Sequence, residues 1–351
     1  MNKISIDNRY IGEAEPCFII AELSANHNQD FARAKEIIKA AKQAGADAVK
    51  FQTYLPSTMT IDSHQEWFQV PSNSIWAGKT LFELYGEAYT PWEWHAELFN
   101  IAHEEGLICF STPFDKTSID LLEDLNVPVY KVASFEVVDL PLLKEIGKTG
   151  KPVIMSTGMA TLSEIAEAIK TLRESGAGPL ILLKCTSAYP ASPESMNLKS
   201  IPHLRDTFNT IVGLSDHTLG SAVPVAAVAL GASVIEKHFT LARSDGGPDS
   251  SFSLEPDEFA KMVTDIRVIE KALGKISYER TAEEQKNVCF RRSLFVVQDM
   301  KKGEAFSLSN LQSIRPGNGL APRYMDIVLG KKVVKDIKRG TPVSWDLMAA
   351  E

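Results

Sequence analysis

The sequence predicts a closed (β/α)8 barrel, or TIM barrel, of the α/β class, followed by a small C-terminal β-rich domain. Eight short apolar runs alternate with amphipathic stretches rich in Ala, Glu and Lys, and several of these stretches stop at a glycine shortly before the next run. Eight such repeats over about 240 residues are typical of this barrel. The alternative, a doubly wound open sheet, usually has fewer repeats and a Gly-rich first turn, which this chain lacks.

The apolar runs are short and continuous, as expected of strands buried on both faces in a parallel sheet. We predict strands at 18–23, 48–54, 108–114, 129–134, 153–158, 180–187, 211–217 and 234–240. Helices are expected between most of them, with FARAKEIIKAAKQAG (31–45) and LSEIAEAIKTLRESG (162–176) as the clearest examples. The barrel domain is therefore expected to occupy residues 1–275.

The gap between the second and third strands is unusually long and aromatic. Residues 55–105 include Trp76 and Trp92 among many other aromatic side chains. Part of this segment must be a loop inserted on the face where the strands end. Its aromatic residues fit either a satellite hydrophobic cluster or a lid or subunit contact, and the sequence does not separate these alternatives.

The pattern changes after the helix expected at 255–273. Residues 276–290 are polar and charged, which is typical of a linker. Residues 291–351 alternate short apolar runs with turns at glycines such as Gly303 and Gly340, which indicates a small β-rich domain. A domain of about 60 residues buries little surface by itself, so we expect it to dock on something.

Composition and charge exclude several classes of protein. The 351 residues are 44% hydrophobic and 23% charged, which is enough apolar material for a full core and argues against disorder. The net charge of −8 offers no footprint for nucleic acid, and an anionic substrate would need a local cluster of Lys and Arg. Four scattered cysteines, no run of transmembrane length and no apolar leader predict a cytoplasmic protein without a membrane partner.

Polar side chains stand at the C-terminal end of every predicted strand, where barrels of this kind carry their active sites. This ring comprises Glu22, Lys50, Gln52, Ser111, Thr112, Lys131, Ser134, Glu136, Ser156, Thr157, Thr186, Ser187, Ser215, Asp216, His217 and His238. A single polar strand end carries little information, but polar residues at all eight ends predict an active site.

Two histidines end the last two strands. His217 closes the seventh and His238 lies near the end of the eighth, and the segment between them is predicted to be helical. Adjacent parallel strands place equivalent ends at the same height, so two imidazoles there can share one metal ion and leave positions open for substrate and water. The alternative is that one or both histidines only satisfy hydrogen bonds in the core.

Lys50 and Lys131 place fixed positive charge within the ring. Short hydroxyl side chains accompany them at Thr112, Ser134, Ser156 and Ser215. Together these groups suit a phosphate and a carboxylate held at once. A lysine inside a barrel could instead form a Schiff base, or serve as a buried ion-pair partner. The residue types leave all three roles open.

Glu22 and Glu136 are candidate proton carriers or water-orienting groups, because a carboxylate among lysines stays ionised and can accept a proton. Their alternative role is to orient the lysines. Three further side chains are candidate substrate contacts: Phe114, Tyr189 and Asp249. The glycine-rich loop at 243–256 could close over a sugar or simply connect the last strand to its helix.

Many strings in this chain resemble, in order and spacing, the sialic acid synthase family. They are IIAELSANHNQD, ADAVKFQTY, FSTPFD, VYKVASFE, IMSTGMA, LLKCTSAYP, VGLSDHTLG, IEKHFT and RPGNG. The resemblance spans nearly the whole chain and includes a C-terminal segment similar to the family's antifreeze-like (SAF) domain. Among family members, SIWAGKTLFELYGEAYTPWEW, ARSDGGPDSSFSLEPDEF and FRRSLFVV are most similar to the branch that makes pseudaminic acid.

The resemblance implies a metal-dependent condensation of phosphoenolpyruvate with an acetamido-sugar aldehyde. It implies a divalent ion (Mn2+, Mg2+ or Co2+) on His217 and His238. The positions that match the family's phosphoenolpyruvate-binding set are Lys50, Thr112, Lys131, Ser134, Ser156 and Ser215. The positions that match the sugar site and reaction centre are Glu22, Gln52, Glu136, Tyr189 and Asp249. Arg315 in RPGNG matches a SAF-domain arginine that reaches the neighbouring subunit's site, which implies a domain-swapped homodimer.

One position departs from the family pattern. Sialic acid synthases carry Asn in a CTN string where this chain has Ser187 in CTSAYP. That position is expected to touch the sugar, so the change argues against N-acetylmannosamine and for a different hexose. A Schiff-base aldolase using Lys131 or Lys184, and a carbohydrate-binding barrel without catalysis, stay as alternatives.

Overall fold

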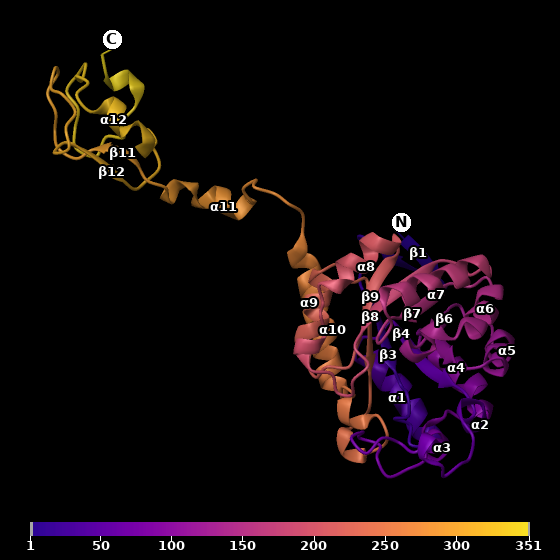
Figure 1. The fold of residues 1–351 in the computed structure, drawn as a ribbon. Coiled ribbons are helices and arrows are strands. Elements are labelled where there is room, and N and C mark those ends of the chain that lie inside the picture. The colour runs from indigo at the N-terminus through magenta and orange to yellow at the C-terminus, as the bar shows by residue number, and fades with distance from the viewer. Residues whose placement is uncertain (1–2, 350–351) are drawn as a thin grey trace. The chain divides into compact units, whose positions relative to one another are not determined.

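The computed structural model describes residues 3–349, and the chain divides into two compact units, Met1–Gly274 and Lys275–Glu351 (Figure 1). The boundary falls directly after the last helix of the barrel, and each unit has an apolar core of its own. Within residues 3–349, no helix combines the length and the hydrophobicity needed to cross a membrane.

Eight parallel strands form a closed barrel in the first unit, which confirms the predicted fold. They are β3 (Phe18–Glu22), β4 (Ala48–Thr53), β5 (Ile108–Pro113), β6 (Tyr130–Val132), β7 (Val153–Ser156), β8 (Leu180–Cys185), β9 (Ile211–Asp216) and β10 (Val234–His238). Each strand pairs with the next along the chain, and β10 also pairs with β3, which closes the barrel. The register sets His238 beside Glu22 and Glu22 beside Lys50, so the strand ends form a ring of neighbours.

One main helix follows each strand and packs on the outside of the barrel (Figure 1). These helices are α1 (Phe31–Gln43), α4 (His95–Glu104), α5 (Lys116–Asp124), α6 (Leu140–Lys148), α7 (Leu162–Glu174), α8 (Ser200–Phe208), α9 (Ala222–Ala229) and α10 (Pro256–Leu273). Short polar side chains begin several of them: Asp30 and Asp115 each accept two backbone N–H groups, and Thr161 forms a capping box with Glu164. Short 3-10 turns within the described residues are η1 (Glu66–Phe68), η2 (Trp92–Trp94), η3 (Ser134–Val138), η4 (Pro193–Ser195), η5 (Arg243–Asp245), η6 (Ser250–Phe252), η7 (Val288–Phe290), η8 (Pro322–Tyr324) and η9 (Trp345–Leu347).

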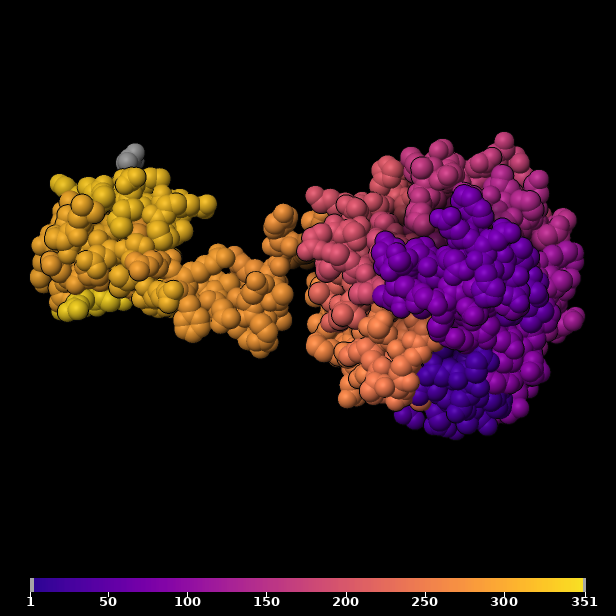
Figure 2. Space-filling view, turned by 60° about the horizontal axis from the view of Figure 1, so that its bottom comes forward, coloured from indigo at the N-terminus to yellow at the C-terminus, as the bar shows by residue number. Residues whose placement is uncertain are grey.

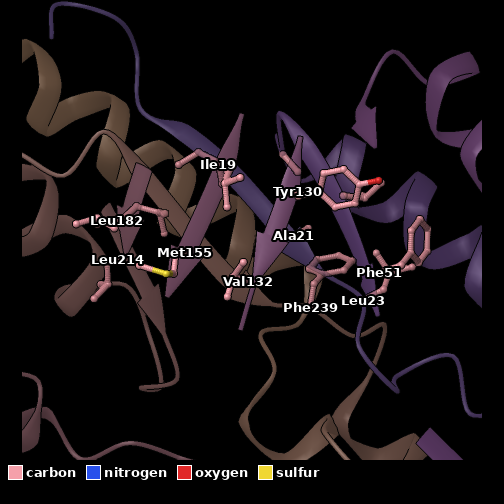
Figure 3. Packing of buried hydrophobic residues seen from close by; sticks show 14 of the residues in the cluster. Ile19, Ala21, Leu23, Phe51, Tyr130, Val132, Met155, Leu182, Leu214 and Phe239 are labelled. Atoms are coloured by element: carbon pink, nitrogen blue, oxygen red, sulfur yellow. The ribbon is translucent and has the colours of Figure 1, made fainter. Parts of the chain in front are cut away.

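Two apolar layers hold the barrel together. The outer layer lies between the strands and the helices, and Figure 3 shows part of it, including Ile19, Phe51 and Met155. The inner layer fills the barrel near the strand starts with alternate residues such as Phe18 and Ile20. Successive side chains of a strand point to opposite faces, so each strand contributes to both layers.

An N-terminal hairpin that the sequence analysis did not predict joins the inner layer. Its strands are β1 (Lys3–Ile6) and β2 (Arg9–Gly12), and Ile4, Ile6 and Ile11 are buried with the residues that begin the barrel strands. The alternation of isoleucine with polar residues in KISIDNRYIG is the signal that could have revealed it. Because the hairpin packs on the strand starts, the opposite end carries the barrel's polar side chains.

The inserted segment after β4 is anchored by two buried histidines. It contains α2 (Pro56–Met59) and α3 (Leu81–Ala88) ahead of α4. His95 bonds to Thr53 through Nε2 (2.8 Å), and its Nδ1 donates to the carbonyl of Pro91 (3.1 Å). His27 accepts a backbone N–H from Gln29 at Nδ1 (3.1 Å) and bonds to Thr90 through Nε2 (3.3 Å). These bonds tie the insertion to the barrel with two imidazoles that must stay neutral.

Acid is expected to destabilise the fold through these two histidines. Burial lowers the pKa of both His27 and His95 to about 4, whereas an unfolded histidine titrates near 6.5. The unfolded chain therefore binds protons first as the pH falls, and stability is lost from about pH 6.5 downward, by about 2 kcal/mol per histidine at pH 5. Urea unfolding between pH 8 and 5 measures this loss, and His95→Gln should flatten the pH dependence. An unchanged slope in that variant would contradict the assignment.

The C-terminal unit is a small β-rich fold with its own core. Strands β11 (Ser293–Val296) and β12 (Leu311–Ile314) pair antiparallel, and the short helix α12 (Met325–Val328) follows. The buried core residues are Leu294, Val296, Met300, Phe306, Leu311, Val328, Val333, Ile337, Val343, Leu347 and Met348. The segment 276–290 is polar as expected, but it contains the helix α11 (Ala282–Asn287), capped by Thr281, which the sequence analysis did not predict.

Candidate active site

The predicted phosphoenolpyruvate and metal residues gather at the C-terminal end of the barrel. Nine predicted side chains are buried there: Glu22, Lys50, Thr112, Lys131, Ser134, Ser156, Ser215, His217 and His238. Burying charged groups inside an apolar barrel is costly unless they are paired. Such a concentration therefore marks a site where the fold gives up stability for chemistry.

Two buried lysines form the centre of the cluster. Lys50 Nζ lies 2.5 Å from Glu22 Oε2 and donates to Thr112 Oγ1 (3.2 Å). Lys131 Nζ donates to Ser156 Oγ (2.7 Å) and to the carbonyl of Val132 (2.8 Å). Burial lowers the pKa of Lys131, whereas for Lys50 the nearby carboxylates outweigh burial and raise the pKa. Lys50 is therefore a fixed cation, and Lys131 is the more readily neutralised lysine.

Glu236 bridges the two lysines, and the sequence analysis missed it. Its Oε1 lies 3.6 Å from Lys50 Nζ and 4.0 Å from Lys131 Nζ, and it accepts from Ser215 Oγ (3.2 Å). The lysine charges hold its pKa low against burial. Glu236 precedes His238 by two residues on β10 and therefore points to the same face. That period of two was the signal available in IEKHFT.

Two members of the predicted ring face away from this cluster. Asp216 pairs with the fully buried Lys237, and Ser111 Oγ bonds to Thr53 Oγ1 (2.6 Å) beside His95. Both belong to the strand face that packs against the helices. Their position at a strand end gave no information on which face they occupy.

The two candidate proton carriers differ in their surroundings. Glu22 is held by Lys50 and accepts from Gln52 Nε2 (3.2 Å), whereas Oε2 of Glu136 is buried without a hydrogen-bond partner among residues 3–349. Burial raises the pKa of each to about 7, against the charge of Lys50 at Glu22 and of Lys131 at Glu136. Both can exchange a proton near neutral pH, but only Glu136 has an oxygen free to do so.

His217 and His238 lie side by side at the ends of β9 and β10. Their ring centroids are 5.3 Å apart. His217 Nδ1 donates to the carbonyl of Thr186 (3.0 Å), which leaves its Nε2 as the lone-pair donor. Nδ1 of His238 is buried without a partner in the described chain, and burial lowers its pKa well below the usual value. Two neutral imidazoles with free lone pairs fit a divalent metal ion.

A second group of side chains forms the rim of the site. Asp249 accepts from Ser24, which in turn accepts from Gln52 Nε2 (3.2 Å), so the loop after β10 is linked to the end of β3. Burial raises the pKa of Asp249 to about 6. Tyr189 packs on His217 with centroids 4.5 Å apart.

Three predicted residues have different surroundings. Phe114 packs edge-on against Tyr54 (5.3 Å) at the base of the insertion. The hydroxyl of Ser187 is buried and lacks a partner within residues 3–349, as expected of a group that awaits a ligand. Arg315 is exposed and follows β12 in the C-terminal unit, so its part in a neighbouring site stays a prediction.

A separate groove of about 1450 Å³ lies at the other end of the barrel. It is lined by Arg9, Asp47, Arg267 and other residues near the strand starts, and none of the predicted site residues lines it. Cavity size therefore does not indicate where the chemistry is.

Comparison with known proteins agrees with the architecture and the site. The model of the NeuB family matches residues 37–278, and that of the SAF domain matches residues 291–348. The chain belongs to the NeuB family. This NeuB member is 49% identical to the pseudaminic acid synthase of Campylobacter jejuni over 323 residues, 92% of this chain and 94% of the relative. It is 46% identical to the pseudaminic acid synthase of Helicobacter pylori over 335 residues, 95% of this chain and 98% of the relative.

A solved structure supports the same assignment. The N-acetylneuraminic acid synthetase of Leptospira borgpetersenii, crystallised with citrate, aligns with a TM-score of 0.73 at 33% identity, over 82% of this chain and 95% of that one. The NeuB protein is therefore an enzyme of the sialic acid synthase family, a phosphoenolpyruvate-dependent transferase that forms a C–C bond in making a nonulosonic acid. The barrel and the SAF domain at the C-terminus are those of this family.

Proposed function

We propose that this enzyme is a pseudaminic acid synthase. It would condense phosphoenolpyruvate with 2,4-diacetamido-2,4,6-trideoxy-L-altrose and water, and release pseudaminic acid and phosphate. The observation that carries the choice of sugar is similarity over almost the whole chain to two relatives of that name. Ser187, in place of the Asn of a CTN string, adds support for a sugar other than N-acetylmannosamine.

The buried lysine cluster supports binding of phosphoenolpyruvate. Lys50 and Lys131 supply two cations, and the hydroxyls of Thr112 and Ser156, now bonded to the lysines, are donors that can turn to an anion. Glu22 and Glu236 balance the lysine charges while no anion is present. An incoming phosphate and carboxylate would compete with these carboxylates for the lysines, so binding favours uptake of a proton by Glu22, whose pKa is already raised.

Glu136 supports the water-adding step. Carbon 3 of phosphoenolpyruvate bonds to the aldehyde carbon, whose oxygen gains a proton, and positive charge develops at carbon 2. Water then bonds to carbon 2 and loses a proton, which the unpartnered Oε2 of Glu136 can accept. The bond from carbon 2 to the phosphate oxygen breaks, and phosphate leaves toward Lys50 and Lys131.

The two histidines would hold a divalent metal ion, with Mn2+, Mg2+ and Co2+ as candidates. The free lone pairs of His217 and His238 fit such an ion. When bound, it would supply Lewis-acid polarisation of the sugar's aldehyde group. The protein's own contribution is to keep both imidazoles neutral by burial and to fix the tautomer of His217 through Thr186.

A domain-swapped homodimer is part of the same proposal. Arg315 is exposed in a unit with a separate core, which is compatible with reaching the site of another copy. The full chain is expected to sediment as a dimer, and a monomer at working concentration would exclude this arrangement.

Phosphate release from phosphoenolpyruvate tests the function directly. The wild-type enzyme is expected to release phosphate with 2,4-diacetamido-2,4,6-trideoxy-L-altrose at a kcat/KM at least about 100-fold above that for N-acetylmannosamine, a ratio that several sugar contacts together can supply. The panel should include the diacetamido precursor of legionaminic acid, and each sugar is run with and without a chelator. No release with any sugar, or a preference for N-acetylmannosamine, would overturn the proposal.

A further inference from the structure

A loop at residues 70–79 extends from the insertion and carries Trp76. The loop is closed at its base, where Val70 N–H donates to the carbonyl of Lys79 (3.0 Å) and Gln69 pairs with Thr80. Most of its residues are exposed, but Trp76 is half-buried. A large aromatic side chain at the tip of a polar loop is a natural contact point with the rest of the molecule.

Trp76 makes two contacts, and both lead to the site. Its indole Nε1–H donates to the carbonyl of Pro248 (2.6 Å), and its ring lies 5.7 Å from that of Tyr189. Tyr189 in turn packs on His217 (4.5 Å). The indole is therefore one aromatic ring farther out than the ring that touches the histidine pair.

The loop that carries Pro248 is fixed on its other side. Asp249 accepts from the hydroxyl of Ser24 and from the backbone N–H of Ala25 (3.4 Å), both just after β3. In the space-filling view the insertion and the segment after β10 lie side by side on the face turned forward (Figure 2). Trp76 thus joins two segments that are far apart in sequence across the end of the barrel.

From these contacts we propose that Trp76 is a specificity residue that forms the outer wall of the sugar pocket. This inference rests on the proposed function. The reacting aldehyde carbon belongs at the histidine pair, so the opposite end of the sugar extends outward past Tyr189 toward the indole. Because the indole N–H is already bonded to Pro248, the ring offers that end only apolar surface.

An apolar wall selects for the 6-deoxy sugar. The methyl group at carbon 6 would lie against the indole face, whereas a hydroxyl at carbon 6 would lose water without gaining a partner. The hydrogen bond to Pro248 has a second effect, because it holds the indole in place over Tyr189. Ring and N–H contribute separately and can be removed separately.

Three variants separate these contributions. Trp76→Phe keeps a ring and removes the N–H, Trp76→Ala removes both, and Trp67→Ala is the matched control, because Trp67 lies in the same insertion but is 83% exposed. The substrates are 2,4-diacetamido-2,4,6-trideoxy-L-altrose and its 6-hydroxy counterpart. For Trp76→Ala we expect the KM for the 6-deoxy sugar to rise about 10- to 100-fold and the preference over the 6-hydroxy sugar to narrow about 10-fold. Trp76→Phe should lie between this variant and the wild type.

The KM for phosphoenolpyruvate and the melting temperature distinguish a specificity role from a structural one. Both should stay close to wild type in Trp76→Phe and Trp67→Ala, and Trp76→Phe keeps the test valid if Trp76→Ala does not fold. Unchanged sugar KM and preference in the Trp76 variants of an active enzyme would overturn the role of Trp76 alone. Parallel increases in both KM values would likewise overturn it. Wild-type inactivity with every sugar would overturn the proposed function and this role together.

Discussion

Replacing Glu136 with glutamine is expected to lower kcat about 1000-fold, within the range that a positioned general acid or base contributes. Gln keeps the size and the polarity of the side chain but cannot accept a proton. The structure separates Glu136 from Glu22, because Oε2 of Glu136 is buried without a hydrogen-bond partner within residues 3–349, whereas Glu22 is paired with Lys50. The KM for phosphoenolpyruvate should change little in Glu136→Gln.

The pH profile of kcat gives a second, independent readout of the same assignment. Burial raises the pKa of Glu136 to about 7, so the ionised base is lost as the pH falls below that value and kcat should fall with it. This acid limb should be absent from the residual activity of Glu136→Gln. Glu22→Gln should instead raise the KM for phosphoenolpyruvate, since it removes a partner of Lys50, and the exposed Glu167→Gln serves as the neutral control. Loss of the acid limb in Glu22→Gln but not in Glu136→Gln would reverse the assignment.

The barrel strands were predictable because their signal is local. Each strand is a continuous apolar run that precedes an amphipathic helix, and burial on both faces removes the ambiguity of which side is polar. The hairpin of β1 and β2 was missed because its three isoleucines are spread over two short strands, and their burial depends on packing against the barrel starts. Such packing is a tertiary effect that no local pattern states.

The site was predictable to the extent that it lies at strand ends. Position at an end brought Lys50, Lys131 and the two histidines together, but it does not tell which face of the strand a side chain occupies. That missing information is why Glu236 was overlooked and why Asp216 was grouped with the ring, although it pairs with a lysine on the outer face. Counting back by two from His238 would have found Glu236. The contact between Trp76 and Pro248 joins residues 172 positions apart, and no spacing rule predicts it.

Removing either histidine of the pair is expected to abolish turnover and metal binding together. His217→Gln and His238→Gln each delete one of two imidazole ligands, and a divalent ion held by a single protein ligand would be lost at micromolar concentrations. We expect kcat to fall at least about 1000-fold, the scale of a lost Lewis acid. Manganese titration followed by electron paramagnetic resonance measures the binding directly, and His203→Gln, an exposed histidine on α8, is the matched control.

The same experiment decides between the metal and a Schiff base. With a metal on His217 and His238, a chelator should stop phosphate release, added Mn2+ should restore it, and borohydride should trap no substrate on Lys131 or Lys184. The environment of Lys131 already favours the first outcome, because its Nζ is occupied by Ser156 and Val132 and faces Glu236, as suits a lysine that holds an anion. Full activity in the presence of chelator, or a borohydride-stable adduct on either lysine, would contradict the metal mechanism. In that case the two histidines would be left as hydrogen-bonding groups of the core.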